Sequence, residues 1–349
     1  MVTERLVPGV FQPGDEVRVI APSGSLSTIG MECREIANRR FGDLGLTLSF
    51  GRHVEQCDEF GSSPIQSRLA DLHDAVADPN VKAILTAFGG CNTNQLLPFV
   101  DWELIRENPK ILCGYCDITA LSCSMFAKTG LVTFSGPHYS SFGMLEHLDQ
   151  TLEWFTRTVM ASEPLSIKPS QTWSDEAWYL NQHNRTIEPN EGYWVVSEGS
   201  AVGTLIGGNL CTLNLLQGTQ YMPNPPGAVV FVEDDFESMF STFDRNLTSL
   251  TQQPGFDGVR ALLIGRFQKS VGMTRSMLGA IVSANGALND VSILANVDFG
   301  HTDPIPTLPV GGPICILVAP SAFWWPHLHF GGPISIDVTV GATELLETS

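Results

Sequence analysis

Short apolar runs alternate with segments of helical spacing along the first half of the chain. The runs predict strands at residues 16–21, 46–50, 81–88 and 111–115. Apolar residues spaced three and four apart predict helices at residues 30–40, 67–77, 93–107 and 150–160. This alternation indicates an open parallel sheet with helices on both faces.

The pattern changes at residues 162–200, which hold three of the seven Trp and show little periodicity. A long stretch of this kind in a compact enzyme is usually a lid or a binding loop, so we expect it to lack regular structure. Alternation then resumes. Strands are predicted at 228–233, 259–267 and 292–299, helices at 238–252 and 277–284, and further β-structure at 313–318 and 333–340.

These patterns predict an α/β protein with two domains. We expect an N-terminal open parallel-sheet domain at residues 1–165 and a second α/β domain at residues 201–349. Residues 166–200 are expected to connect them and to carry a Trp-bearing substrate loop.

One strand, turn and helix stand out between residues 110 and 126. An apolar run ends at Cys113, Gly114 follows, and helical spacing resumes at Leu121. α/β hydrolytic enzymes expose a nucleophile on such a turn, where the helix N-terminus stabilises negative charge. The residue at the turn is Cys116, although on this stretch alone a buried thiol explains it more simply.

Two further polar residues occupy the same kind of position. Glu233 and His301 each stand at or just past the C-terminal end of a predicted strand, as Cys116 does. Catalytic groups of α/β folds gather at that edge, and a nucleophile needs a base and an orienting carboxylate. Taken singly, Glu233 could be an exposed acid and His301 a turn residue.

Two glycines directly after a predicted strand are candidates for an oxyanion hole. The amides of Gly89 and Gly90, together with that of Asp117, could face the same cleft as Cys116. The alternative is an ordinary turn at the end of a strand.

Composition narrows the classes of function. The chain has 349 residues, a net charge of −18 and an isoelectric point near 4.7, which disfavours nucleic-acid polymers and anionic membrane surfaces as partners. No apolar run approaches the ~18 residues of a membrane span, and the N-terminus does not resemble a signal peptide. We therefore expect a cytoplasmic protein.

The cysteines and glycines do not indicate a cofactor. Of eight cysteines, only Cys113 and Cys116 have CxxC spacing, and no second pair of metal ligands follows nearby. Neither a GxGxxG nor a P-loop motif occurs. We expect no metal and no cofactor.

Motifs spread over nearly the whole chain resemble those of one enzyme family. They lie at residues 13–15, 21–23, 83–94, 98–101, 108–110, 114–121, 129–137, 206–210, 233–234, 265–267 and 298–302. The family is the LD-carboxypeptidases, a group of serine peptidases, and the similarity is greatest to its microcin-immunity branch.

The resemblance implies a Ser-Glu-His triad. Carried over residue by residue, the base is His301, its orienting acid is Glu233, and the nucleophile position holds Cys116 where the family has Ser. The implied oxyanion hole is formed by the amides of Gly90 and Asp117.

The resemblance also implies a substrate class. The expected reaction is hydrolysis of a peptidyl- or aminoacyl-nucleotide of the microcin C type, by a homodimer. An aromatic residue of the connecting loop would stack on the nucleobase, and we favour Trp178 over Trp173 for this role. The alternative is that both indoles only pin the loop to its domain. Gly89 and Asn209 are further expected substrate contacts.

Two other functions stay open. One is a murein LD-carboxypeptidase that trims tetrapeptides in cell-wall recycling. The other is a protein that binds the same ligand with little turnover, because a thiol in a pocket shaped for a hydroxyl misplaces the reacting atoms. Cys116 could belong to a working thiol enzyme, to a weakened natural homologue, or to an engineered Ser→Cys variant.

Overall fold

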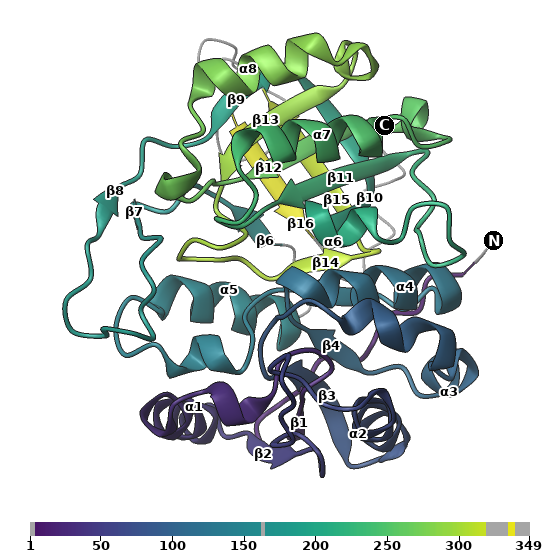
Figure 1. Cartoon of the computed structure of the whole chain (residues 1–349), viewed down its shortest axis with the longest axis vertical. Helices are drawn as coiled ribbons and strands as arrows, with labels where there is room; N and C mark the ends of the chain where they lie inside the picture. The colour runs from purple at the N-terminus through teal and green to yellow at the C-terminus, as the bar shows by residue number, and fades with distance from the viewer. Residues whose placement is uncertain (1–3, 162–164, 319–333, 339–349) are drawn as a thin grey trace.

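Two sheets, one in each half of the molecule, form the framework of the fold (Figure 1). The computed structural model describes residues 4–161, 165–318 and 334–338. Helices pack against both sheets, which confirms the predicted α/β class.

The first sheet is parallel except at one edge. Its six strands are, in spatial order, β14 (Leu308–Val310), β5 (Thr133–Ser135), β4 (Ile111–Cys113), β3 (Val81–Thr86), β1 (Glu16–Ile20) and β2 (Thr47–Phe50). Strand β14 pairs antiparallel with β5. Because β1 lies between β2 and β3, the strand order reverses there, and loops at such a point line ligand sites in open α/β sheets.

Helices cover both faces of the first sheet. Helices α1 (Met31–Asp43) and α5 (Asp149–Val159) share one apolar cluster on one face. Helices α2 (Ile65–Ala77), α3 (Trp102–Glu107) and α4 (Thr119–Thr129) belong to a second cluster, which continues into the other half of the molecule. Helix α4 therefore lies between the two sheets (Figure 1).

The second sheet has eight strands around a parallel centre. They are, in spatial order, β6 (Leu165–Ile167), β16 (Ile334–Val338), β15 (Pro313–Val318), β10 (Gly199–Asn209), β11 (Ala228–Glu233), β12 (Ala261–Gly265), β13 (Ser292–Val297) and β9 (Trp194–Ser197). Every residue of β11, β12 and β13 is buried. The helices of this half are α6 (Leu210–Asn214), α7 (Phe240–Thr251) and α8 (Arg275–Ala284).

Two strands cross between the halves. Strand β14 belongs to the second half in sequence but completes the first sheet, whereas β6, at the start of the connecting segment, joins the second sheet. Each sheet therefore includes a strand from the other half of the sequence. The domain limits predicted at residues 165 and 201 remain a prediction.

The prediction that residues 162–200 lack regular structure is wrong in part. They contain β6, β9 and the small two-stranded sheet of β7 (Thr172–Trp173) and β8 (Glu188–Pro189). These strands have two to four residues, and most pair with distant parts of the chain, so local periodicity carries no signal for them.

The single helix predicted at 93–107 is also wrong. A 3₁₀ segment, Thr93–Phe99, is followed by a separate helix α3. Pro98 cannot donate the hydrogen bond that a continuous helix needs, and Asp101 caps α3 by accepting from the Leu104 amide at 3.0 Å. Of the β-structure predicted at 333–340, residue 333 and residues 339–340 lie outside the described residues.

Within the described ranges, none of the helices combines the length and the apolar character needed to cross a membrane.

Candidate active site

Cys116 stands at a sharp turn between β4 and α4. After Gly114 and Tyr115 the chain reaches Cys116 with a φ of 59°, and a short 3₁₀ turn then leads into α4. Positive φ is strained for a residue with a side chain, and such strain is typical of a nucleophile elbow. The side chain is half-buried rather than enclosed.

The turn after β3 packs against the Cys116 side chain. A Cβ atom added to Gly89 would lie 2.9 Å from the Cβ atom and 3.0 Å from the Sγ atom of Cys116. The carbonyl of Gly89 accepts a hydrogen bond of 2.9 Å from the amide of Gly24 after β1. Because Gly89 has no side chain, the turn after β3 can pack against Cys116, which follows β4. The same turn is hydrogen-bonded to the loop after β1.

His301 and Glu233 form a hydrogen-bonded pair. The Nδ1 atom of His301 lies 2.7 Å from the Oε2 atom of Glu233, the buried last residue of β11. Gly300, at φ 106°, makes room, because a Cβ atom there would lie 2.8 Å from the same oxygen. Burial alone would lower the pKa of His301, but the charges of Glu233 and Cys116 and hydrogen bonds to both raise this pKa well above its ordinary value.

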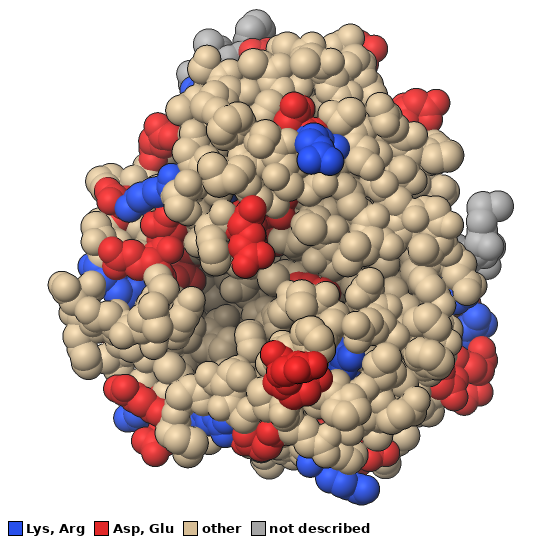
Figure 2. All heavy atoms as spheres, in the orientation of Figure 1, with Lys and Arg blue, Asp and Glu red and all other residues tan. Residues whose placement is uncertain are grey.

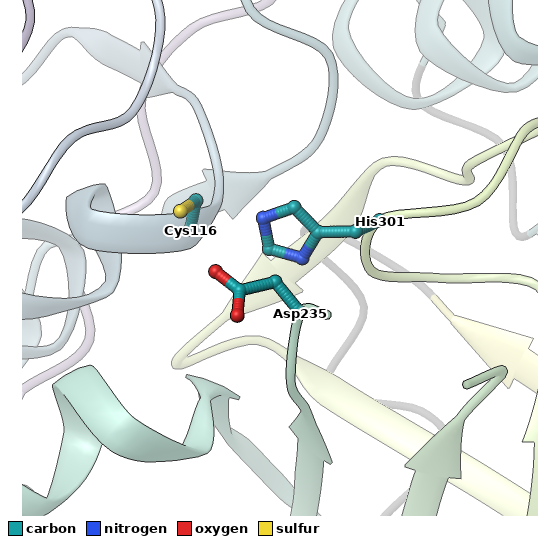
Figure 3. A group of neighbouring side chains, drawn as sticks. All are labelled: Cys116, Asp235 and His301. Carbon is teal, nitrogen blue, oxygen red and sulfur yellow. The ribbon is translucent and has the colours of Figure 1, made fainter. Parts of the chain in front are cut away.

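The two halves bring the thiol and the imidazole together. One ligand atom from each of Cys116, Asp235 and His301 lies within 4.8 Å of the other two. Figure 3 shows the imidazole of His301 and the carboxylate of Asp235 directed toward Cys116, with the three residues on three separate segments. Asp235 was not among the residues predicted from the sequence, although it follows Glu233 by only two residues at the same strand end.

Figure 2 shows a hollow on one face of the molecule, between the two halves, with acidic side chains around it. A cavity of about 360 Å³ is lined by Trp173, Ser174 and Asp303, among others. Asp303 is two residues from His301, so this cavity lies beside the loop that carries the imidazole.

The buried side chain of Asp117 is bound to Ser23 and Thr93. Its Oδ2 atom accepts hydrogen bonds from the Ser23 hydroxyl at 2.5 Å and from the amide and hydroxyl of Thr93 at 2.8 and 2.7 Å. These bonds fix the side chain of the residue that follows Cys116. Gly90 has a φ of 154°, and a Cβ atom there would collide with the Ser23 hydroxyl.

His138 is a buried residue at this site that the sequence analysis missed. Its ring stacks on Tyr115 at 4.3 Å, its Nδ1 atom lies 2.7 Å from the Thr86 hydroxyl, and its Nε2 atom has no partner among the described residues. Burial lowers the pKa of His138 to about 3, with the charge of His301 a further cause. His138 lies three residues past β5, at the same edge of the sheet as the other strand-end residues, and this position is the signal that could have identified it.

Hydrogen bonds join the Trp-bearing loop to the loop that carries His301. Ser174 and Asp303 exchange backbone hydrogen bonds of 2.9 and 2.8 Å. The cations of Arg266 and Lys269 lie 5.0 and 5.3 Å from the centre of the Trp173 ring, so this ring is engaged within the protein.

Trp178 is half-buried and packs against the apolar cluster of α1 and α5. Asn209 is buried and caps α6, because its side-chain oxygen accepts from the Thr212 amide at 3.0 Å. Its side-chain amide faces Asp234 at 3.4 Å. Both polar ends of Asn209 are thus used inside the protein.

Cys113, the CxxC partner of Cys116, is buried in the core. Its thiol lies 3.6 Å from the Pro137 carbonyl, and burial raises its pKa. The Cys113 thiol is therefore part of the core, whereas the Cys116 thiol is half-buried at the turn.

Comparison with known families gives a consistent assignment. The LD-carboxypeptidase N-terminal domain matches residues 17–136, and the LD-carboxypeptidase C-terminal domain matches residues 202–316. The chain is 48% identical over 302 residues to "Putative carboxypeptidase YocD" of Bacillus subtilis, covering 86% of this chain and 93% of that protein.

Two more distant relatives have more specific names. The microcin C7 self-immunity protein MccF of Escherichia coli is 33% identical over 285 residues, which is 78% of this chain and 81% of that protein. The murein tetrapeptide carboxypeptidase of Pseudomonas aeruginosa is 28% identical over 259 residues, which is 74% of this chain and 78% of that protein.

Solved structures agree with these relatives. The MccF-like protein of Bacillus anthracis superposes with a TM-score of 0.90 at 46% identity, covering 96% of this chain and 99% of that one. MccF in complex with aspartyl sulfamoyl adenosine superposes with a TM-score of 0.83 at 27% identity, covering 96% and 98%. The chain therefore belongs to the LD-carboxypeptidase family of serine peptidases and has the fold of its MccF-like members.

Proposed function

We propose that the protein hydrolyses the amide bond of a peptidyl- or aminoacyl-nucleotide of the microcin C type, and so detoxifies it. Cys116 is the nucleophile, His301 the general base and acid, and Glu233 the orienting carboxylate. The observation that carries this proposal is the 2.7 Å pairing of His301 with Glu233, with the imidazole close to the strained Cys116.

Acyl transfer would proceed in two halves. The Nε2 atom of His301 takes the thiol proton, and the sulfur attacks the substrate carbonyl carbon. The tetrahedral intermediate collapses, the C–N bond breaks, and His301 returns the proton to the leaving nitrogen. Water then attacks the thioester with His301 as base, which releases the carboxylic acid and restores the thiol.

The amides of Gly90 and Asp117 are the proposed donors to the oxyanion. Both belong to turns beside the sulfur, and the side chain of Asp117 is fixed by three hydrogen bonds. Preorganised donors of this kind cost no rearrangement during the reaction, and one such donor contributes about 10²–10³-fold in kcat.

The nucleotide part of the proposal is supported by similarity and by the Trp-bearing loop. MccF is a relative of this chain, and a structural neighbour was solved with aspartyl sulfamoyl adenosine. Trp178 is the better candidate for stacking on a base, because two cations already engage the Trp173 ring.

The test is incubation with aspartyl sulfamoyl adenosine and, separately, with a murein tetrapeptide, followed by mass spectrometry. We expect cleavage of the first at its acyl–nitrogen bond. Cys116→Ala should lower turnover by at least about 10³-fold, whereas Cys57→Ser, at an exposed thiol outside the triad, should leave it unchanged. Cleavage of the tetrapeptide alone would contradict the proposal.

The same assay separates the two alternatives. A murein carboxypeptidase, which the Pseudomonas aeruginosa relative suggests, would release the terminal residue of the tetrapeptide. A ligand-binding protein with an altered nucleophile would bind the nucleotide without cleaving it, and Cys116→Ser would then restore cleavage.

The stacking role of Trp178 needs a separate comparison. Trp178→Ala should raise KM for the nucleotide substrate about 5- to 150-fold, given the ~1–3 kcal/mol of a stacked base. It should change KM much less for a plain aminoacyl amide. Equal effects on both substrates would remove the stacking proposal.

A further inference from the structure

The triad does not use Asp235, which faces the reacting atoms. Asp235 lies two residues past β11, is half-buried, and places a carboxylate oxygen within 4.8 Å of ligand atoms of Cys116 and His301. Its Oδ1 atom accepts a hydrogen bond of 2.9 Å from the Glu237 amide. The Oδ2 atom therefore remains available for another partner (Figure 3).

These three side chains are a donor set that zinc prefers. Zn²⁺ binds thiolate, imidazole and carboxylate in a tetrahedron, with metal–ligand distances of about 2.0–2.3 Å. Ligand atoms in such a tetrahedron lie roughly 3.5 Å apart. The spacing of at most 4.8 Å seen here is longer than that value, so the three side chains would draw closer together on binding a metal.

The surroundings of His301 match those of a metal-bound histidine. A metal-bound imidazole usually donates its other N–H to a carboxylate, which fixes the tautomer and the direction of the free nitrogen. Here Glu233 holds the Nδ1 atom at 2.7 Å, so the Nε2 atom is the one available to the metal. Cys116, Asp235 and His301 come from three different strand ends, and their positions are set by the fold of both halves.

Charge also favours a cation at this place. The chain carries a net charge of −18, and acidic side chains border the hollow on the face shown in Figure 2. A cleft of this sign concentrates cations. Glu233, Asp234 and Asp235 form an acidic run at the end of β11, directly beside the imidazole.

We propose that Cys116, Asp235 and His301 form a reversible binding site for a zinc-like divalent cation, which inhibits the protein when occupied. On binding, the proton shared by the thiol and the imidazole passes to the buffer, and the metal takes the sulfur, the Nε2 atom and one carboxylate oxygen. Water fills the fourth position. Both the nucleophile and the base are then withdrawn from catalysis.

This site is not a cofactor site, since the metal opposes the proposed reaction. Metal binding requires only the arrangement of the Cys116, Asp235 and His301 side chains. A protein that cleaves none of the substrates named above would still be expected to bind zinc, so the two proposals fail independently.

The test is a titration of the reduced, chelator-treated full-length protein with Co²⁺ and Zn²⁺, without substrate. Co²⁺ should produce a near-ultraviolet thiolate charge-transfer band with the visible spectrum of a tetrahedral site, at one metal per chain. Zn²⁺ should displace the Co²⁺ and abolish the band. In the activity assay, Zn²⁺ should inhibit, and a chelator should reverse the inhibition.

Variants identify the ligands. Cys116→Ser should abolish the charge-transfer band, and Asp235→Asn should weaken Zn²⁺ binding at least about 10-fold. Glu233→Gln, which alters only the partner of His301, should weaken it about 10- to 100-fold. Matched controls are Cys57→Ser and Glu237→Gln, an exposed thiol and an exposed acid outside the donor set, and these should bind Zn²⁺ normally.

A band that persists in Cys116→Ser would overturn the assignment, as would equal Zn²⁺ affinity in Asp235→Asn and Glu237→Gln. Circular dichroism of each variant separates a lost ligand from a lost fold.

Discussion

At the scale of single residues, the site depends on how closely the backbone approaches the sulfur. Gly89 is in contact distance of Cys116, and any side chain there must displace the thiol or the turn. We expect Gly89→Ala to lower kcat/KM about 10²-fold, because small misplacements of reacting atoms are costly. The measurement is steady-state kinetics on the nucleotide substrate.

The matched control for this change is Gly279→Ala. A Cβ atom at Gly279 in α8 has no neighbour within 4 Å, so this variant should keep full activity. Normal activity in Gly89→Ala would show that the turn after β3 does not position the nucleophile.

His138 provides a prediction about acid stability. Its pKa is about 3 in the folded protein because of burial, whereas an unfolded histidine titrates near 6.5. The unfolded chain therefore takes up the proton first, and stability is lost as the pH falls from about 6.5 toward 3. At pH 5 this loss is about 2 kcal/mol.

We expect His138→Gln to flatten the pH dependence of the unfolding free energy between pH 7 and pH 4, measured by urea denaturation. His183→Gln, at an exposed position, should leave the slope unchanged. An unaltered slope in His138→Gln would mean that other groups control acid unfolding.

At the scale of elements, the Trp-bearing loop depends on a few links to the His301 loop. The Arg185 guanidinium donates a 2.9 Å hydrogen bond to Asp303, and Asp303 exchanges backbone bonds with Ser174. Arg185 is almost fully buried, with 2% of its side chain exposed, so the protein supplies no easy replacement for this contact.

Arg185→Gln should therefore loosen the loop. A hydrogen bond to a charged group contributes about 1.5–3 kcal/mol, which corresponds to roughly 10- to 100-fold faster amide hydrogen exchange in residues 172–189. Arg157→Gln, which removes a guanidinium from an exposed pair, should have no such effect. Equal exchange in both variants would count against the link.

At the scale of the whole molecule, the net charge of −18 should influence how substrates arrive. An anionic nucleotide is repelled at low ionic strength, and salt screens that repulsion. We expect kcat/KM for the anionic substrate to rise roughly 2- to 10-fold between low salt and about 0.15 M. An uncharged amide substrate should change little, and a fall for the anionic one would contradict this prediction.

Assembly and location belong to the same scale. The cytoplasmic location remains a prediction from the sequence, and the homodimer remains a prediction from the family resemblance. Light scattering of the purified protein measures the mass in solution directly, and a monomer would contradict the prediction.

Local sequence was sufficient for the elements that are long and periodic. The strand at 228–233 has the predicted bounds, and the elbow around Cys116 has the predicted strand, turn and helix. The α/β class and the family are confirmed for the same reason, since strand–helix alternation and contiguous motifs are properties of nearby residues.

Local sequence did not predict the pairing of strands whose partners lie far away along the chain. Strand β14 pairs with β5, more than 150 residues earlier, and no local pattern specifies that pairing. Pro98 divides a segment whose apolar spacing alone predicts one helix.

The amino-acid sequence by itself determined the kind of fold, the family and the three strand ends where Cys116, Glu233 and His301 stand. Only the tertiary structure decided that the loops from both halves meet. It places Glu233 on the Nδ1 atom of His301, Gly89 against the sulfur of Cys116, and Asp235 beside both Cys116 and His301. The physical reason is that hydrogen bonds and close contacts act over a few ångströms in space, whereas the residues they join can lie far apart in the chain. Cys116 and His301 are 185 positions apart (301 minus 116).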